Sequence, residues 1–177
     1  FSIVRNSNDD NASSIRIGKT RGTSAGDNTI IADDDFIGLI RFFAGDGTDR
    51  ASDVASIFCQ IDGTPGANDT PGKLTFNVAA DGTNSSSQAM MIEEDGRITI
   101  NQTDNQGGNR LVVTENDQSI NAVQFRSTHA SFDAKTLFLG SNRTNSSGFI
   151  LCDMHTNNTN DIEFRVRGDG EVGADGS

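Results

Sequence analysis

The chain contains two histidines, His129 and His155, which are the first residues to test for catalysis or metal binding. Two imidazoles are too few for a three-histidine metal site, and their spacing lacks the HExxH pattern of zinc proteases. Ser127, His129 and Asp133 supply the residue types of a catalytic triad, but they lie on one short stretch without a nucleophile elbow. We therefore predict no catalytic residue there and interpret both histidines as solvated loop residues.

Paired carboxylates are the second chemistry to test, because glycoside hydrolases place two acidic side chains across a groove. Glu93 and Glu94 are adjacent, so on a strand they point to opposite faces. Glu115, Glu163 and Glu171 each stand alone in the sequence. These patterns predict that the protein is not an enzyme.

Three acidic clusters are candidates for calcium binding. Residues 33–35 are consecutive aspartates, Asp46 lies near Asp49, and Asp62 lies near Asp69. Calcium takes about six to eight oxygen ligands, and none of these clusters matches the EF-hand loop or the glycine-rich nonapeptide repeat. We interpret them as solvated turns and predict no metal site and no cofactor. The alternative that stays open is a cation on a three-fold axis, held by one Asp or Asn from each copy.

The two cysteines are predicted to be free thiols. Cys59 and Cys152 each fall in phase with the apolar residues on either side of them, which is typical of a buried thiol on a strand. A disulfide between them would require the two parts of the chain to pack side by side.

The composition excludes several classes of partner. The chain has a net charge of −11, which disfavours nucleic acid and anionic membrane surfaces. Its most apolar run, Phe36 to Ala44, is interrupted by Gly38 and Arg41 and is far shorter than the ~20 residues of a membrane helix. The first ten residues lack the regions of a signal peptide. We expect no membrane insertion.

Period-two alternation of apolar residues predicts an all-β fold. The expected strands centre on residues 57–61, 74–78, 98–100, 111–113, 123–125, 137–139 and 162–166. Helical periodicity is limited to residues 49–57 and 86–94, where a turn or two of helix fits. The predicted core positions on these strands are Ile57, Ile61, Leu74, Phe76, Ile98, Ile100, Phe164 and Val166.

Asp-Gly pairs separate these strands, at residues 46–47, 62–63, 81–82, 95–96, 169–170 and 175–176. The pair favours tight turns because both residues tolerate positive φ, and short strands joined in this way suggest a sandwich, a barrel or a fibrous β-prism. Only 33% of the residues are hydrophobic, enough for one thin apolar layer per strand. We therefore expect a homotrimer, in which each copy covers the apolar layers and sheet edges of the others around a three-fold axis.

The chain divides into two modules of similar plan. We expect a first β-rich module over residues 1–100, a polar linker over 101–109 and a second β-rich module over 110–177. The first ends in DGRITI and the second contains RGDGEV, so that in each an Asp-Gly pair opens a strand. Units that end alike and repeat end to end are typical of elongated shafts.

The amino-acid sequence of the first module resembles a repeat module of bacteriophage tail fibres. The stretches GKTRGTSAGDNTIIADDDFIGLIRFFAGDGTD, ASIFCQIDGTPGANDTPGKLTFNVAADGT and MMIEEDGRITI follow one another as in that family, and Asp62 to Phe76 matches its central D-G-T-P-G-x-N-D-x-P-G-x-L-x-F block. The second module, with FRSTHASF, FLGSNR and IEFRVRGDGEVGADGS, is similar to the fibre segment that precedes a C-terminal intramolecular chaperone. The resemblance implies antiparallel strands in an elongated, trimeric, intertwined fibre.

The resemblance also implies a function, namely that of a structural shaft of a viral tail fibre that supports host attachment. It implies a virion location outside the cell and contacts with neighbouring fibre or virion proteins, while host surface glycans would be met at a separate tip. The chain has no Trp and no Tyr, the residues that usually stack on sugars, which favours a shaft over a tip. Of its Phe residues, Phe36, Phe43 and Phe149 are candidates for exposure. The alternative is a subunit of a secreted extracellular filament or adhesin built from the same module.

Overall fold

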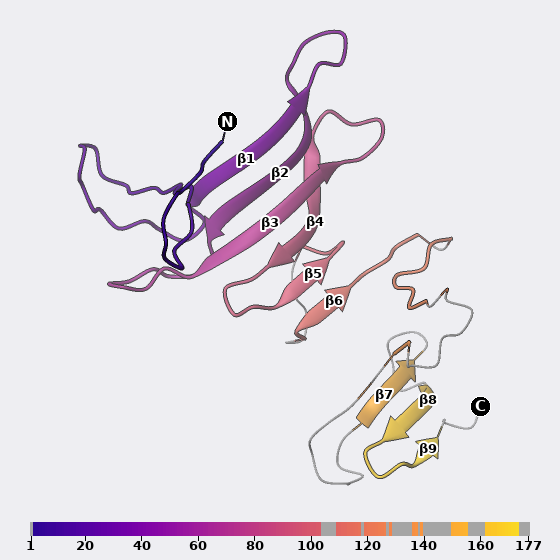
Figure 1. Cartoon of the computed structure of the whole chain (residues 1–177). Helices are drawn as coiled ribbons and strands as arrows, with labels where there is room; N and C mark the ends of the chain where they lie inside the picture. Colours follow the sequence, from indigo (N-terminus) through magenta and orange to yellow (C-terminus); the bar gives the residue numbers. More distant parts are fainter. Residues whose placement is uncertain are drawn as a thin grey trace. The chain divides into compact units, whose positions relative to one another are not determined.

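The computed structural model describes residues 2–103, 109–117, 119–126, 128, 136–137, 139, 150–155 and 162–173. Within these residues the protein is all-β, with antiparallel sheets and no helix, which confirms the predicted fold class (Figure 1). The chain forms two compact units, Phe1–Val123 and Gln124–Ser177, and each is described by itself below.

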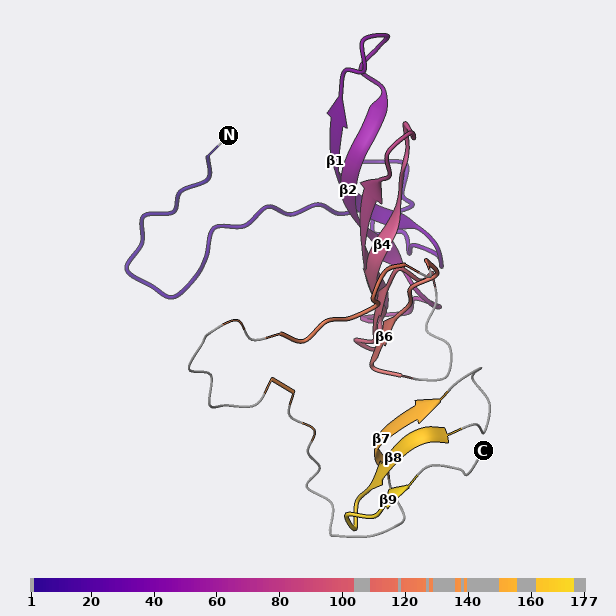
Figure 2. The same cartoon turned by 90° about the vertical axis from the view of Figure 1, so that its right-hand side faces the viewer.

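The first unit is built on one six-stranded sheet. Its strands are β1 (Phe36–Ala44), β2 (Ser52–Ile61), β3 (Gly72–Ala79), β4 (Ser86–Ile92), β5 (Ile98–Ile100) and β6 (Leu111–Val113), and they lie in this order across the sheet (Figure 1). Turned by 90°, the sheet is seen nearly edge-on as a single layer (Figure 2). Strands β1 to β5 pair antiparallel, as expected for strands joined by short turns.

Strand β6 differs from the rest, because it pairs with β5 in parallel. The connection between them spans residues 101–110, and this length lets the chain return to the same end of the sheet before β6 begins. The sequence analysis assigned residues 111–113 to the second module, whereas here their hydrogen bonds belong to the first sheet.

The second unit contains a three-stranded antiparallel sheet of β7 (Ile150–His155), β8 (Ile162–Arg167) and β9 (Val172–Gly173). Asp153 and Arg165 lie directly opposite each other on β7 and β8. The guanidinium of Arg165 donates two hydrogen bonds to the Asp153 carboxylate, at 2.9 and 2.8 Å. This bidentate ion pair fixes the register of β7 and β8 more firmly than an ion pair with one hydrogen bond would.

The described Asp-Gly pairs lie in the connections between strands, which in the first sheet are longer than tight two-residue turns. Positive φ occurs at Gly47, Gly63, Gly82, Gly96 and Gly170, the glycines of five of the six pairs; the sixth lies outside the described residues. In the β4–β5 turn, Gly96 has a φ of 79° and donates its N–H to the Glu93 carbonyl at 2.9 Å. The Asp95 side chain accepts the Arg97 N–H at 3.0 Å and so closes the other half of the turn.

Local structure differs from the sequence analysis in a few segments. Residues 49–57 and 86–94 were the stretches in which a turn or two of helix fitted, yet β2 and β4 run through most of them as extended strands. Each of these strands is hydrogen-bonded on both sides, and that tertiary pairing outweighs a weak helical propensity. Residues 123–125 were expected to form a strand and do not, and the middle residue of the segment 137–139 lies outside the described residues.

The predicted core is only partly closed within one chain. Of the eight expected positions, Ile61 is buried, Ile57, Phe76, Ile98 and Val166 are half-buried, and Leu74, Ile100 and Phe164 are exposed. The most deeply buried side chains are instead Thr75 and Thr99, on the other face of the sheet. A single copy therefore leaves most of its apolar strand positions in contact with water.

The buried Thr99 hydroxyl generates a prediction about stability. Thr99 is 0% exposed, and its Oγ1 has no hydrogen-bond partner among the described residues. A buried hydroxyl without a partner costs about 1–3 kcal/mol. We predict that Thr99→Val, which replaces that hydroxyl with a methyl group of similar shape, raises the free energy of unfolding by about 1 kcal/mol. Urea titration at fixed protein concentration measures this change in the free energy of unfolding.

Thr99→Ala serves as the control. It removes the hydroxyl and also leaves a small cavity, so it should be less stable than the valine variant. A valine variant less stable than the natural protein would contradict the prediction.

Candidate functional site

One face of the six-stranded sheet carries two unbroken rows of uncharged, mostly large apolar residues. The rows are Ile40, Ile57, Phe76, Met90, Ile100 and Val113, and then Gly38, Cys59, Leu74, Ile92, Ile98 and Leu111, each read from β1 to β6 through directly paired residues. Paired residues share a face, and residues two apart on a strand do so as well. Both rows therefore lie on the same side of the sheet, which we call the apolar face.

The apolar face is open to solvent in the single chain. Ile40 is 48% exposed and Leu111 60%, Leu74 and Ile100 are also exposed, and the other large side chains in the two rows are half-buried. Each square ångström of apolar surface removed from water is worth about 25 cal/mol, so an uncovered face of this kind carries a large unrealised stabilisation. A contiguous exposed apolar surface is typical of an interaction surface.

The opposite face is buried along its central strands, whereas Leu39 of β1, on the same face, is 45% exposed. Its central row, Thr75, Met91 and Thr99, is buried. Lys73, Glu93 and Arg97 stand on the same face, each two residues along its strand from that row, and none of the three is highly exposed. Arg97 pairs with Glu93 at 3.0 Å between Nε and Oε2. We call this side the polar face, because these charged side chains stand beside its buried row.

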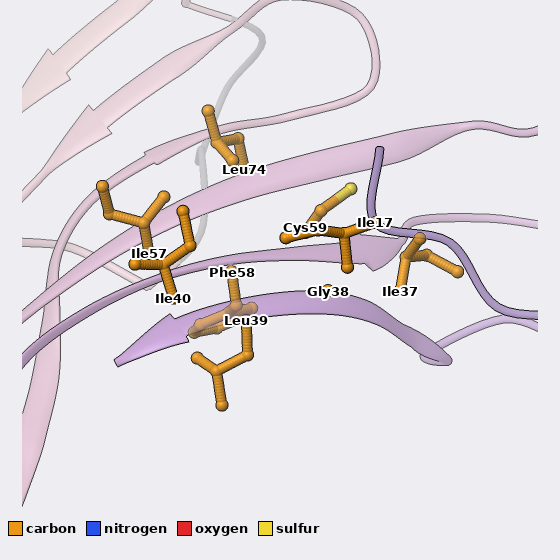
Figure 3. Close-up of a pocket in the computed structure, with 9 residues that line it drawn as sticks. All are labelled: Ile17, Ile37, Gly38, Leu39, Ile40, Ile57, Phe58, Cys59 and Leu74. Carbon is orange, nitrogen blue, oxygen red and sulfur yellow. The ribbon is translucent and has the colours of Figure 1, made fainter. Parts of the chain in front are cut away.

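A small cavity of about 190 Å³ opens beside β1, where the chain before the sheet meets it. It is lined by Ile17, Ile37, Gly38, Leu39, Ile40, Ile57, Phe58, Cys59 and Leu74 (Figure 3). A Cβ atom on Gly38 would lie 2.5 Å from Cγ2 of Ile17, so only glycine lets Ile17 approach β1 this closely. Ile17 therefore packs directly against the apolar face.

A buried carboxylate holds the segment that carries Ile17. Asp35 is 8% exposed and accepts hydrogen bonds from Lys19 Nζ at 2.6 Å, Arg21 Nε at 2.7 Å and the Ala32 N–H at 2.9 Å. These donors, Arg21 first, hold the pKa of Asp35 well below its usual range. The Asp35 carbonyl also accepts the N–H of Ile61 at 2.9 Å, which ties the cluster to β2.

The aspartates next to this cluster also bind donors of the chain itself. Asp33 Oδ1 accepts the Gly63 N–H at 2.8 Å, and Lys73 Nζ lies 3.0 Å from Asp62 and 3.7 Å from Asp34. Burial disfavours the ionised form of Asp62, but the hydrogen bonds from Lys73 and Glu94 and the charge of Lys73 together outweigh it and lower the pKa of Asp62. These carboxylates fasten the turns to one end of the sheet.

The Asp46–Asp49 turn is built in the same way. Asp46 accepts the N–H groups of Thr48 and Asp49 at 2.8 and 3.0 Å and the Ser52 hydroxyl at 2.8 Å. The backbone N–H groups of Asp49 and Thr48 are the main reason that the pKa of Asp46 falls to about 2. Among the described residues, no three His, Cys, Asp or Glu side chains gather as a metal site would require.

The remaining candidates from the sequence are a Ser-His-Asp cluster and the glutamates. Ser127, His129 and Asp133 lie outside the described residues. Glu93 pairs with Arg97, whereas the hydrogen bond of Glu94 to Asp62 raises the pKa of Glu94. Glu115 Oε1 accepts two backbone N–H groups of the loop that follows it, and Glu171 pairs with Arg167 at 3.1 Å.

Three further expectations from the sequence concern the exposed phenylalanines, the two cysteines and membrane-spanning helices. Phe36 and Phe43 are exposed as expected, while Phe149 lies outside the described residues. Cys59 and Cys152 are free thiols, as predicted, but both are half-buried rather than buried. The described part of the chain forms no helix that could cross a bilayer.

The Asp35 cluster was missed in the sequence. Its cationic partners lie 14 and 16 residues away in an irregular segment, where no periodicity relates them to Asp35. The apolar face was visible only as separate strands, because pairing register decides which rows line up.

Comparison with known proteins gives a fold but no family. No family model and no curated protein matches the chain. The carboxy-terminal domain of the bacteriophage T5 L-shaped tail fibre is similar in structure, with a TM-score of 0.51 and 16% sequence identity over 90% of this chain and 64% of that one. A structure of the same fibre region with its intramolecular chaperone domain has a TM-score of 0.43 and 18% identity, and covers 53% of this chain and 24% of that chain.

These neighbours are tail-fibre domains, and the T5 carboxy-terminal domain shares the all-β fold of this chain. The chain spans less than two thirds of the length of either neighbour.

Asp35 generates a prediction about pH. Its pKa is lowered on folding from an ordinary value of 3.8, so its contribution to stability is complete above that value and is lost as pH falls below it. We predict that Asp35→Asn lowers the unfolding free energy at pH 7 and flattens its decline between about pH 4 and 2. Chemical denaturation across this pH range measures both effects.

Asp10→Asn is the charge-matched control, since Asp10 is exposed. It should leave the pH dependence close to that of the natural protein. Equal pH profiles for Asp35→Asn and Asp10→Asn would show that the cluster does not stabilise the fold.

Proposed function

We propose that the chain is a shaft segment of a trimeric viral tail fibre, and that its apolar face lines the interior of the trimer. The observation that carries this proposal is the contrast between the two sides of the sheet. One side has a buried central row with charged side chains beside it, while the other carries two uncharged rows that the described chain leaves half-buried or exposed. Three copies that turn their apolar faces to a common axis would bury those rows and keep the polar faces in water.

Two further observations support a tail fibre. The structural likeness is to a tail-fibre domain, and the Asp62–Phe76 block resembles a tail-fibre repeat. In the proposed fibre, the modules over residues 1–100 and 110–177 follow one another through the linker 101–109, with β6 of the second reaching back to pair with β5 of the first.

The proposed role is mechanical. The segment holds a distal tip away from the virion, outside the cell, and so serves host attachment without catalysing a reaction. Its partners are the two other copies and neighbouring fibre or virion proteins, and host glycans would meet the tip. Buried inter-chain contacts would make unfolding slow, and a net charge of −11 would keep the fibre soluble.

The mass of the assembly in dilute native solution tests the proposal. Sedimentation should give about three times the chain mass of 18.8 kDa. A monomer would overturn the trimer. Masses spread over many sizes would favour the polymerising extracellular filament instead.

A matched pair of substitutions on β1 tests which face is interior. Ile40 and Leu39 are neighbours with nearly equal exposure, 48% and 45%, but they stand on opposite faces. We predict that Ile40→Asp weakens assembly by at least about a hundredfold in dissociation constant, because each copy would bury a charge at the axis. Leu39→Asp should leave the mass of the assembly unchanged.

Phe76→Asp and Ile98→Asp should also abolish assembly, since both residues belong to the apolar face. Circular dichroism checks that each variant keeps its β structure. A trimer that survives Ile40→Asp but not Leu39→Asp would place the other face inside.

A further inference from the structure

Residues 2–16, which precede the sheet, form an arm that contributes no strand to it. All of its residues are exposed. Its side-chain hydrogen bonds stay within the arm, where Asp9 accepts from Arg5 at 2.6 Å, Ser7 at 2.6 Å and the Asn11 N–H at 3.0 Å. The trace of the arm runs away from the sheet in Figure 2.

The residues that directly follow the arm, in contrast, are anchored by contacts with the rest of the first unit. Ile17 packs against Gly38, and two residues further on Lys19 begins the buried cluster around Asp35. The position that a Cβ of Gly38 would occupy belongs to the apolar face, since Gly38 pairs with Cys59 in one of its rows. The arm therefore leaves its own sheet on the side of the apolar face.

The chemistry of the arm suits a partner that is apolar and acidic. Ile3, Val4 and Ile15 are all exposed, with Val4 at 74% and Ile15 at 66%. Two arginines and two aspartates, Arg5, Arg16, Asp9 and Asp10, leave the arm with no net charge in a chain of −11. The arm can thus approach a second copy without the repulsion that separates the rest of the two chains.

We propose that the arm of each copy crosses to a neighbouring copy and packs its apolar side chains on that copy's apolar face. This inference rests on the proposed trimer. An arm that leaves its sheet on the apolar side enters the space that the other copies would occupy. Fully extended, its residues would span about 50 Å, whereas a six-stranded sheet is about 24 Å wide.

Arm exchange has a consequence for the assembly that face-to-face packing alone lacks. Each copy would be held by its own face, by its arm on a neighbour and by another copy's arm on its face. A copy could then leave only after two arms had released, so dissociation would be slower at equal buried area.

The first test changes the apolar residues of the arm. The triple variant Ile3→Asp, Val4→Asp and Ile15→Asp alters side chains that are exposed in the single chain, so the sheet itself should fold normally. We expect subunit exchange between differently labelled trimers to be at least about tenfold faster, because three apolar contacts are replaced by charges.

The control adds the same charge at polar positions of the same arm, as Asn6→Asp, Asn8→Asp and Ser13→Asp. Its exchange rate should rise clearly less than that of the first triple variant, because both carry the same added charge and only the first loses the apolar contacts. Equal rates for the two triple variants would overturn arm exchange, while the trimer and the proposed function would stand.

The second test identifies where the arm lies. Chains that carry the photo-cross-linker benzoylphenylalanine in place of Val4, half of them labelled with nitrogen-15, are assembled together and irradiated. Mixed-isotope cross-links between the arm and peptides of β2 to β6 are the expected result. Cross-links confined to single chains, or to the polar face, would overturn the proposal. A natural protein that sediments as a monomer would remove both the proposed function and the exchange that rests on it.

Discussion

The structure depends on one constraint, which is that a single-layer sheet has two faces and the described chain buries the centre of only one of them. Thr75, Met91 and Thr99 form a buried row on the polar face, while the twelve uncharged positions of the apolar face are half-buried or exposed. Removing that surface from water would stabilise the molecule, because the transfer of apolar surface out of water is favourable. The addition of β6 in parallel extends the same face by two residues, Val113 and Leu111, so the irregular pairing enlarges the surface rather than closing it.

The charged residues are arranged so that they do not disturb this surface. Asp33, Asp34 and Asp62 fasten turns at one end of the sheet through Lys73 and a backbone N–H, and Asp35 ties the entering segment to β2. Aspartate is suited to this work because its short carboxylate reaches backbone N–H groups two or three residues away. The acidic clusters therefore have a structural explanation in the hydrogen bonds and ion pairs that they make.

The structural neighbours and the apolar face support the proposal in different ways. Similarity at 16% identity establishes a shared all-β fold with a tail-fibre domain, and folds are reused for unrelated purposes. The apolar face supplies what the fold alone lacks, a surface that the proposed trimer would bury. The arm adds a reason why such an assembly would be hard to take apart, which is the property that a fibre under mechanical load requires.

The sequence by itself determined the strands and turns, because both are encoded by neighbours in the chain. Alternation over residues 57–61, 74–78 and 98–100 specifies extended segments with one apolar side, and Asp-Gly supplies the positive φ between them. Only the tertiary structure decided that Ser86–Ile92 is a strand, that β6 joins the first sheet and that Lys19 and Arg21 meet Asp35. It also decided that the apolar sides of six strands align into one open face. Register and long-range ion pairs depend on residues far apart in the chain, and a one-residue slip in any pairing would have turned that strand's apolar residues to the other side.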